Sequence, residues 1–104
     1  MASYQLDIIT PEGHAFNDTV TSIMAPGEEG FFGIFARHAP LISALKPGVL
    51  TVRTETETIF FAVGEGMLEA DGENVSLLIE GAERATDASD AAAKALTMVH
   101  SRQS

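Results

Sequence analysis

Turn-forming residues interrupt this sequence at short intervals and divide it into short apolar stretches. Within several stretches apolar and polar side chains alternate; in residues 4–9, for example, Leu6 and Ile8 fall on one face of an extended chain. Such alternation is typical of a strand with one buried face. Short strands separated by close turns are typical of an antiparallel sandwich or barrel. No stretch alternates between strand and helix patterns, so the sequence predicts a mainly β fold rather than a parallel α/β fold.

The same alternation places most of the expected elements. We expect strands at residues 4–9, 20–25, 42–45, 49–54, 59–63 and 75–79. Turn signals fall at residues 10–13, 17–18, 26–30, 54–58 and 71–72, and residues 64–66 indicate a bulge or sharp bend. Residues 59–63 are apolar on both faces, so this strand is expected to be central in its sheet or covered on both sides.

From Thr86 onward the chain becomes rich in alanine and takes on helical periodicity. Thr86 or Asp87 is a suitable N-cap, and Asp90 and Lys94 have the spacing of an i,i+4 ion pair. A stripe made mostly of alanine buries little apolar surface, so both firm and loose docking of this short helix stay open. We expect a β-sandwich domain at residues 1–84 and a short Ala-rich helix within residues 85–104. The expected apolar stripe consists of Ala88, Ala92, Ala95, Leu96 and Val99.

The charge of the chain excludes several classes of partner. The formal net charge is −9, which argues against nucleic acid and anionic lipid, because both reward clustered basic residues. No apolar run is long enough to span a membrane, no signal peptide is recognisable, and no cysteine is present for a disulfide or a thiolate metal site. We expect a neutral or basic protein partner. The basic residues are dispersed: Arg37, Lys46, Arg53, Arg84, Lys94 and Arg102.

Histidines and acids are the candidates for chemistry, and neither set forms a recognisable site. His14, His38 and His100 lie far apart and lack the spacing of a zinc or iron site. Glu65 and Glu69 flank a glycine, but no nucleophile, orienting partner or phosphate-binding loop accompanies them. We therefore expect no catalytic residue, no metal and no cofactor. A small enzyme that uses Glu65, Glu69 or His38 is the least favoured interpretation.

Residues 30–48 are the most distinctive stretch of the chain. Here Gly30 and Gly33 bracket Phe31 and Phe32, a pattern that favours a tight bend with positive φ. Two adjacent rings in an extended segment point to opposite sides, so one of them is expected to be exposed or to lie in an interface. A folded-back loop that buries both rings is the alternative.

Two polar features flank these rings, and each has two interpretations. Glu28 and Glu29 form either a solvated turn or an acidic tip that meets a basic partner. His38 either hydrogen-bonds the loop that Pro40 rigidifies or belongs to a contact surface.

Several blocks in a fixed order carry a resemblance to a known family. They are GFFGI at residues 30–34, HAPL at 38–41, LKPG at 45–48 and FAVGEGMLE at 61–69. From about residue 4 to about residue 84 the sequence resembles the epsilon subunit of the rotary F-type ATP synthase. An unrelated sandwich does not need these blocks in register, so their order favours this family over a generic β-sandwich adaptor with another partner.

The resemblance implies an N-terminal sandwich of two antiparallel sheets and a C-terminal helical hairpin. It implies a non-catalytic rotor subunit that lies against the gamma subunit and the polar loops of the c-ring, within the complex that contains the catalytic alpha and beta subunits. Such a subunit couples proton flow to ATP synthesis and is not expected to form a homo-oligomer. In a bacterium it is expected at the cytoplasmic face of the inner membrane. The ring-facing surface maps onto Glu28, Glu29, Phe31, Phe32 and His38. Similar proteins commonly carry an acid at the position of Phe31, so this contact is expected to be more apolar.

The sequence departs from the family pattern near its end. Family members that bind ATP use an Asp/Glu-x-x-Arg-Ala pattern, whereas this chain has Asp87, then Asp90 in place of the arginine, then Ala91. An anion in place of a phosphate-pairing cation predicts weak or no ATP binding. Only one short helix is expected after the sandwich, so we expect no inhibition through an inserted C-terminal helix.

Overall fold

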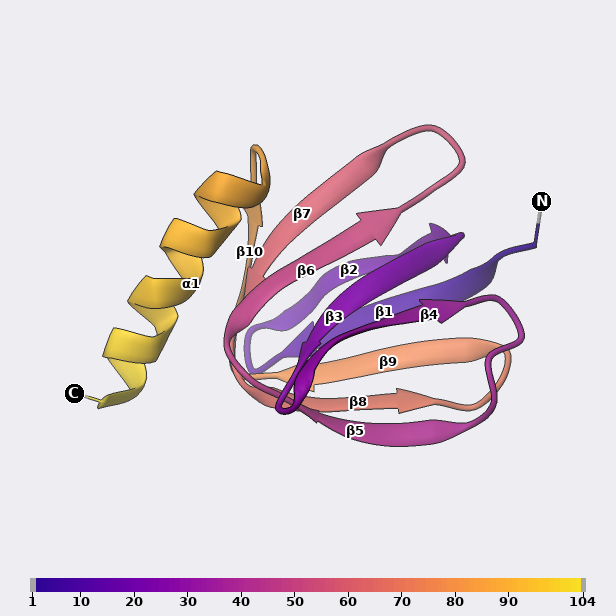
Figure 1. Ribbon diagram of the computed structural model, residues 1–104, viewed down its shortest axis with the longest axis horizontal. Helices are drawn as coiled ribbons and strands as arrows, with labels where there is room; N and C mark the ends of the chain where they lie inside the picture. The colour runs from indigo at the N-terminus through magenta and orange to yellow at the C-terminus, as the bar shows by residue number, and fades with distance from the viewer. Residues whose placement is uncertain (1, 104) are drawn as a thin grey trace.

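The computed structural model describes residues 2–103, with side chains through residue 98 (Figure 1). Ten strands are followed by one helix within this range. Their bounds are β1 Tyr4–Thr10, β2 Gly13–Val20, β3 Ser22–Gly27, β4 Gly30–Phe35, β5 Leu41–Leu45, β6 Gly48–Arg53, β7 Thr58–Val63, β8 Gly66–Ala70, β9 Asn74–Ile79, β10 Ala82–Ala85 and α1 Ala88–Gln103.

The strands form a sandwich of two facing layers that meet at one corner. One layer runs β10-β7-β6-β3 with β4 on the far side of β3, and the other runs β5-β8-β9-β1-β2. The corner lies where Gly27 of β3 pairs with Leu45 of β5. The expected fold class, a β-sandwich followed by a single helix, is confirmed. One detail differs: β1 and β9 run parallel, while every other pair is antiparallel.

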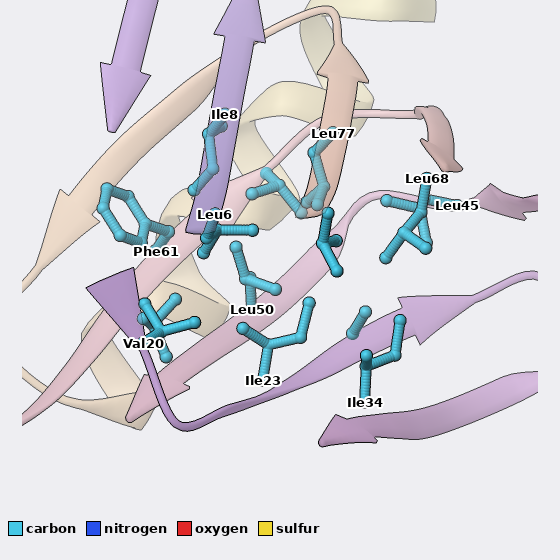
Figure 2. Packing of buried hydrophobic residues seen from close by; sticks show 14 of the residues in the cluster. Leu6, Ile8, Val20, Ile23, Ile34, Leu45, Leu50, Phe61, Leu68 and Leu77 are labelled. Atoms are coloured by element: carbon cyan, nitrogen blue, oxygen red, sulfur yellow. The ribbon is translucent and has the colours of Figure 1, made fainter. Parts of the chain in front are cut away.

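Apolar side chains from the inner faces of both layers fill the space between them. Leu6 and Ile8 of β1 are fully buried, as the alternation of residues 4–9 predicts. The rings of Phe16 and Phe61 meet edge to face across the layers, with centroids 5.8 Å apart. Figure 2 shows Leu6, Ile8, Val20, Ile23, Ile34, Leu45, Leu50, Phe61, Leu68 and Leu77 converging in this core.

Two expectations about the strands are wrong. The turn expected at Asn17 and Asp18 does not form, because β2 continues through both residues. The side chains of Asn17 and Asp18 face solvent. Gln5 Nε2 donates to Asn17 Oδ1 at 2.9 Å, so the Asn17 side chain, which could otherwise stabilise a turn, is bonded across the β1–β2 pair. The loop expected at residues 26–30 shrinks to Glu28 and Glu29. In addition four strands, β2, β4, β8 and β10, were not among the expected strands. Strand β10 carries Glu83 and Arg84 and shows no apolar alternation.

Helix α1 docks on the outside of the sandwich, against β6, β7 and β10. Ala62 of β7 is buried outside the main core cluster, and so are Ala91 and Ala95 of α1. Their small side chains let the helix approach the sheet closely. The expected stripe is wrong at three positions, because Ala88, Ala92 and Leu96 are exposed, Leu96 by 64%, and only Ala95 of the stripe is buried. The side chain of Val99 lies outside the described residues. This docking explains why residues 59–63 are apolar on both faces: β7 is central in its layer and α1 covers its outer side.

We predict that Leu6→Ala lowers the free energy of unfolding by about 3 kcal/mol, because Leu6 is 0% exposed and its removal leaves a cavity between the layers. Urea denaturation followed by circular dichroism measures the change. Leu78→Ala is the matched control on the exposed side of β9 and is expected to cost about 1 kcal/mol or less. Equal losses in the two variants would contradict the assigned core.

Candidate partner-binding surface

The hairpin of β3 and β4 presents its tip to solvent. Gly27 and Gly30 form the last pair of the ladder, and only Glu28 and Glu29 lie beyond them. Gly30 has φ of 133°, a region that favours glycine, so its part in the expected bend is explained. Gly33 is not part of a bend, because it lies within β4. The backbone N–H of Glu28 donates to the Ala44 carbonyl at 3.2 Å and ties the tip to β5.

Phe31 and Phe32 point to opposite sides of β4. Phe32 packs against the core, and a Cβ on Gly27 would lie only 2.8 Å from its ring, so this glycine makes room for the ring. Phe31 is 62% exposed. The sequence-based expectation that one of the two rings is exposed is therefore confirmed, and the folded-back loop that buries both is not observed.

Two apolar residues that the sequence analysis missed enlarge the exposed surface around Phe31. Phe35 is 63% exposed and Met24 is 43% exposed, and both lie on the same face as Phe31. Gly33, opposite Met24, separates the two rings and adds no side chain. The spacing of residues 31, 33 and 35 is the signal that identifies this face. We call Met24, Phe31 and Phe35 the hairpin patch.

Tyr4 fixes the strand that carries this patch. Its hydroxyl donates to the Ile34 carbonyl at 2.8 Å, so β1 of one layer is bonded to β4 of the other. Burial raises the pKa of the Tyr4 phenol, and the Ile23 backbone amide acts in the opposite direction with a smaller effect. The hydroxyl therefore stays protonated and available as a donor at neutral pH.

His38 lies at the other end of β4 from the acidic tip. Its ring Nδ1 donates to the Ala39 carbonyl at 2.8 Å, and its backbone N–H donates to the Phe35 carbonyl at 3.2 Å. These local bonds correspond to the loop-holding interpretation of His38. At about 3.3 Å per residue, β4 separates His38 from Glu28 and Glu29 by about 20 Å. The candidate residues thus follow one strand from end to end and do not form a single cluster.

A second exposed apolar row crosses the outer face of the other layer. Met67 of β8 pairs with Ala44 of β5 on one side and with Leu78 of β9 on the other, and Leu78 pairs in turn with Ile9 of β1. Met67 and Leu78 are exposed. We call these four residues the outer row, a surface that no sequence pattern had indicated.

The candidate groups for catalysis are not brought together. Glu65, Glu69 and His38 line three different surface hollows. His14 Nδ1 lies 2.7 Å from Asp7 Oδ1 in an exposed pair on β1 and β2. Within residues 2–98 no three His, Asp or Glu side chains are placed to hold a metal ion, and no helix of the described chain is long and apolar enough to cross a bilayer.

The start of α1 uses the residues of the degenerate ATP motif as its cap. Asp87 Oδ1 accepts the backbone N–H of Asp90 at 2.8 Å. Asp90 Oδ2 in turn accepts the backbone N–H of Thr86 at 3.0 Å and lies 3.1 Å from Lys94 Nζ. The Thr86 backbone N–H first, and then Lys94, hold the pKa of Asp90 below its usual value. Ala91 is buried on the side of α1 that packs against the sheet. The side chains of Asp87 and Asp90 thus cap the helix, and Ala91 helps to dock it.

Lys94 then ties the capped helix to β10. Its Nζ donates to the Arg84 carbonyl at 3.3 Å and lies 4.0 Å from Glu83 Oε1. The i,i+4 pair of Asp90 and Lys94 that the spacing predicts is thus confirmed, and it belongs to a wider set of contacts between α1 and the sandwich.

These features define a small β-sandwich with exposed apolar surfaces, in which the candidate catalytic groups of the described residues lie apart. Residues 3–85 match the family described as ATP synthase, Delta/Epsilon chain, beta-sandwich domain, and the chain belongs to this family. The resemblance drawn from the glycine, HAPL and LKPG blocks is confirmed.

Curated relatives and solved structures agree with this assignment. The chain is 46% identical over 90 residues to ATP synthase epsilon chain 1 of Methylococcus capsulatus, covering 86% of this chain and 64% of that one. It is 38% identical over 98 residues to the epsilon chain of Sulfurimonas denitrificans, covering 92% and 75%. The chain thus spans a little less than two thirds of the first relative. In fold it resembles a chain of the Euglena gracilis mitochondrial ATP synthase (OSCP, F1 and c-ring), with a TM-score of 0.77, 21% identity and coverage of 97% and 66%.

We predict that Asp90→Asn lowers the melting temperature at pH 6 but has little effect near pH 2. The pKa of Asp90 is depressed in the folded chain, so its stabilisation is complete above the unfolded pKa of about 3.9 and is lost as the pH falls through the lower folded pKa. Thermal melts of both proteins across this range measure the difference. Glu12→Gln, at an exposed acid on the β1–β2 turn, is the control. A difference for Asp90→Asn that is equally large at both pH values would contradict the role of the carboxylate.

Proposed function

We propose that this chain is a non-catalytic rotor subunit in the central stalk of an F-type ATP synthase, where it couples proton flow to ATP synthesis. The match of residues 3–85 to the ATP synthase Delta/Epsilon sandwich carries this proposal. The relatives named above are epsilon chains, and one structural neighbour comes from the central stalk and c-ring of the Tetrahymena thermophila mitochondrial ATP synthase (TM-score 0.66, 15% identity, coverage 77% and 65%). Bacterial relatives favour a position at the cytoplasmic face of the inner membrane.

Two separate exposed surfaces suit two partners. We assign the β3–β4 hairpin to the c-ring, with Glu28 and Glu29 supplying charge at the tip and Phe31 supplying apolar contact. Phe32 supports Phe31 from inside the sandwich, and His38 holds the loop at the far end of the same strand. The outer row on the opposite layer is left for the gamma subunit. Exposed apolar surface of this extent, on a chain with a net charge of −9, favours partners that offer apolar and basic groups.

We divide the chain into a sandwich domain, residues 1–84, and a short helical segment, residues 85–104, of which the described part is α1. Because α1 packs on β7 through Ala91 and is held by Lys94, we propose that this helix stays on the sandwich and does not inhibit the catalytic subunits by insertion. Asp90 supplies a negative charge where a phosphate-pairing arginine would be needed, and its carboxylate is already engaged in the cap.

We predict that Phe31→Ala weakens capture of ATP synthase subunits from detergent-solubilised membranes about tenfold, since exposed aromatic anchors carry much of the energy of an interface. Tagged wild type and variant are compared by affinity purification and mass spectrometry. Leu96→Ala, equally exposed but on α1, is the matched control and is expected to behave as wild type. Recovery of the same subunits by both variants would move the contact away from the hairpin. Recovery of other proteins instead would favour the alternative, a β-sandwich adaptor with another partner.

We predict that ATP with Mg²⁺ produces no saturable rise in the melting temperature. A ligand present at a hundred times its Kd stabilises a protein by about 2.7 kcal/mol, so tight binding would be visible. A relative that carries the Asp/Glu-x-x-Arg-Ala pattern is the positive control. A saturable rise for this chain would contradict the proposed loss of ATP binding.

A further inference from the structure

Within residues 2–103, strand β4 forms a hydrogen-bonded ladder along one edge alone, with β3. The carbonyl of Pro26 in β3 accepts the N–H of Lys46, so Pro26 faces away from β4. Backbone groups of an antiparallel pair alternate in direction, so the residues of β4 that bond to β3 are Gly30, Phe32 and Ile34. Phe31, Gly33 and Phe35 therefore direct their N–H and C=O groups outward. The Phe35 carbonyl is taken by His38, and no partner is found for the outward groups of Phe31 and Gly33 among the described residues.

This edge lacks the features that normally prevent strands from pairing with other chains. Charged residues, prolines and bulges protect most edge strands, and β4 contains none of them: its sequence is GFFGIF. Two other exposed edges differ. Strand β10 carries Glu83 and Arg84, and β2 carries polar residues and an extra residue, Ala15, where its register with β1 shifts between Ile8 and Ile9.

We propose that β4 binds an extended segment of a partner protein, which adds to the layer as a further strand. Only an extended backbone offers donors and acceptors at the spacing of the outward groups of Phe31 and Gly33. This inference rests on the proposed function, because the segment is assigned to the c-ring, the partner proposed above for the β3–β4 hairpin. The added strand would give the contact at the β3–β4 hairpin backbone hydrogen bonds in addition to the side-chain contacts proposed above.

The surroundings of the edge define the side chains of this segment. Phe31 and Phe35 lie on one face, so the segment carries apolar residues at alternate positions facing them. Glu28 and Glu29 lie at one end of β4, so a basic residue belongs at that end of the segment. A second copy of this chain is disfavoured, because two chains that each carry a net charge of −9 repel each other.

Gly33 allows the backbone ladder to be tested separately from the side chains. A Cβ at this position would lie 3.4 Å from the Phe35 ring and 3.6 Å from Met24 Cε, which is ordinary contact. Gly33→Pro removes the outward N–H but leaves the bonds of its neighbours to β3 intact, and proline is tolerated where an edge N–H faces solvent. Gly33→Ala adds a side chain and keeps the N–H, so it is the matched control.

The experiment uses ATP synthase complex from which this subunit has been removed, and rebinds the full chain to it. Amide hydrogen exchange of residues 30–35 is compared in the free and bound protein. We expect the Phe31 and Gly33 amides to exchange at least about tenfold more slowly when bound. Gly33→Pro is expected to bind about tenfold more weakly, while Gly33→Ala binds within about twofold of wild type.

The remaining outcomes distinguish failure of strand addition from failure of the proposed function. Binding with no added protection at Phe31 and Gly33, or with equal affinity for the two Gly33 variants, overturns strand addition and leaves the rotor function intact. Failure of the wild-type chain to rebind overturns the proposed function together with this assignment of the segment. Protection that grows with the concentration of the free chain, accompanied by a dimer in sedimentation, shows that a second copy occupies the edge and overturns the proposal.

Discussion

Burial of two inner strand faces against each other is the interaction on which the rest of this molecule depends. Leu6, Ile34 and Leu77 come from distant parts of the sequence and are all fully buried in one core. Because this core takes up the inner faces of strands such as β1, β6, β7 and β9, additional apolar residues on them lie on the outer faces. Outer-face apolar residues are either covered by α1, as at Ala62, or exposed, as at Phe31 of β4.

Sequence patterns predicted the elements whose signal is periodic and missed those whose structure depends on neighbours. Alternation located β1, β6, β7 and β9, because each buries one face or both. It could not show β10, whose charged residues form a strand only because β7 offers a free edge, and it placed a turn at Asn17 that the β1 ladder overrides. For the site, local sequence separates Phe31 from Phe32, but adjacency of Met24 to both exposed rings requires the strand register. Likewise, only the sheet shows which face of α1 is covered.

Asp90, at the position where the ATP-binding pattern has an arginine, has a structural role of its own. Asp90 satisfies a backbone donor at the start of α1 and positions Lys94, which bonds to the Arg84 carbonyl of β10. One residue thus helps both to begin the helix and to dock it. A helix with so few large apolar side chains depends on such polar contacts, since Ala91 and Ala95 bury little surface by themselves.

The parallel pairing of β1 with β9 determines the order in which the chain is able to fold. Hairpins such as β3–β4 and β6–β7 need only neighbouring residues and form early. Strand β1, by contrast, waits for residues 74–78 before its second edge is paired. During synthesis the ribosome must release most of the sandwich before the layer containing β1 closes. Until then the edge of β1 that pairs with β9 stays open, so the late arrival of β9 lengthens the interval in which a nascent chain is exposed to aggregation.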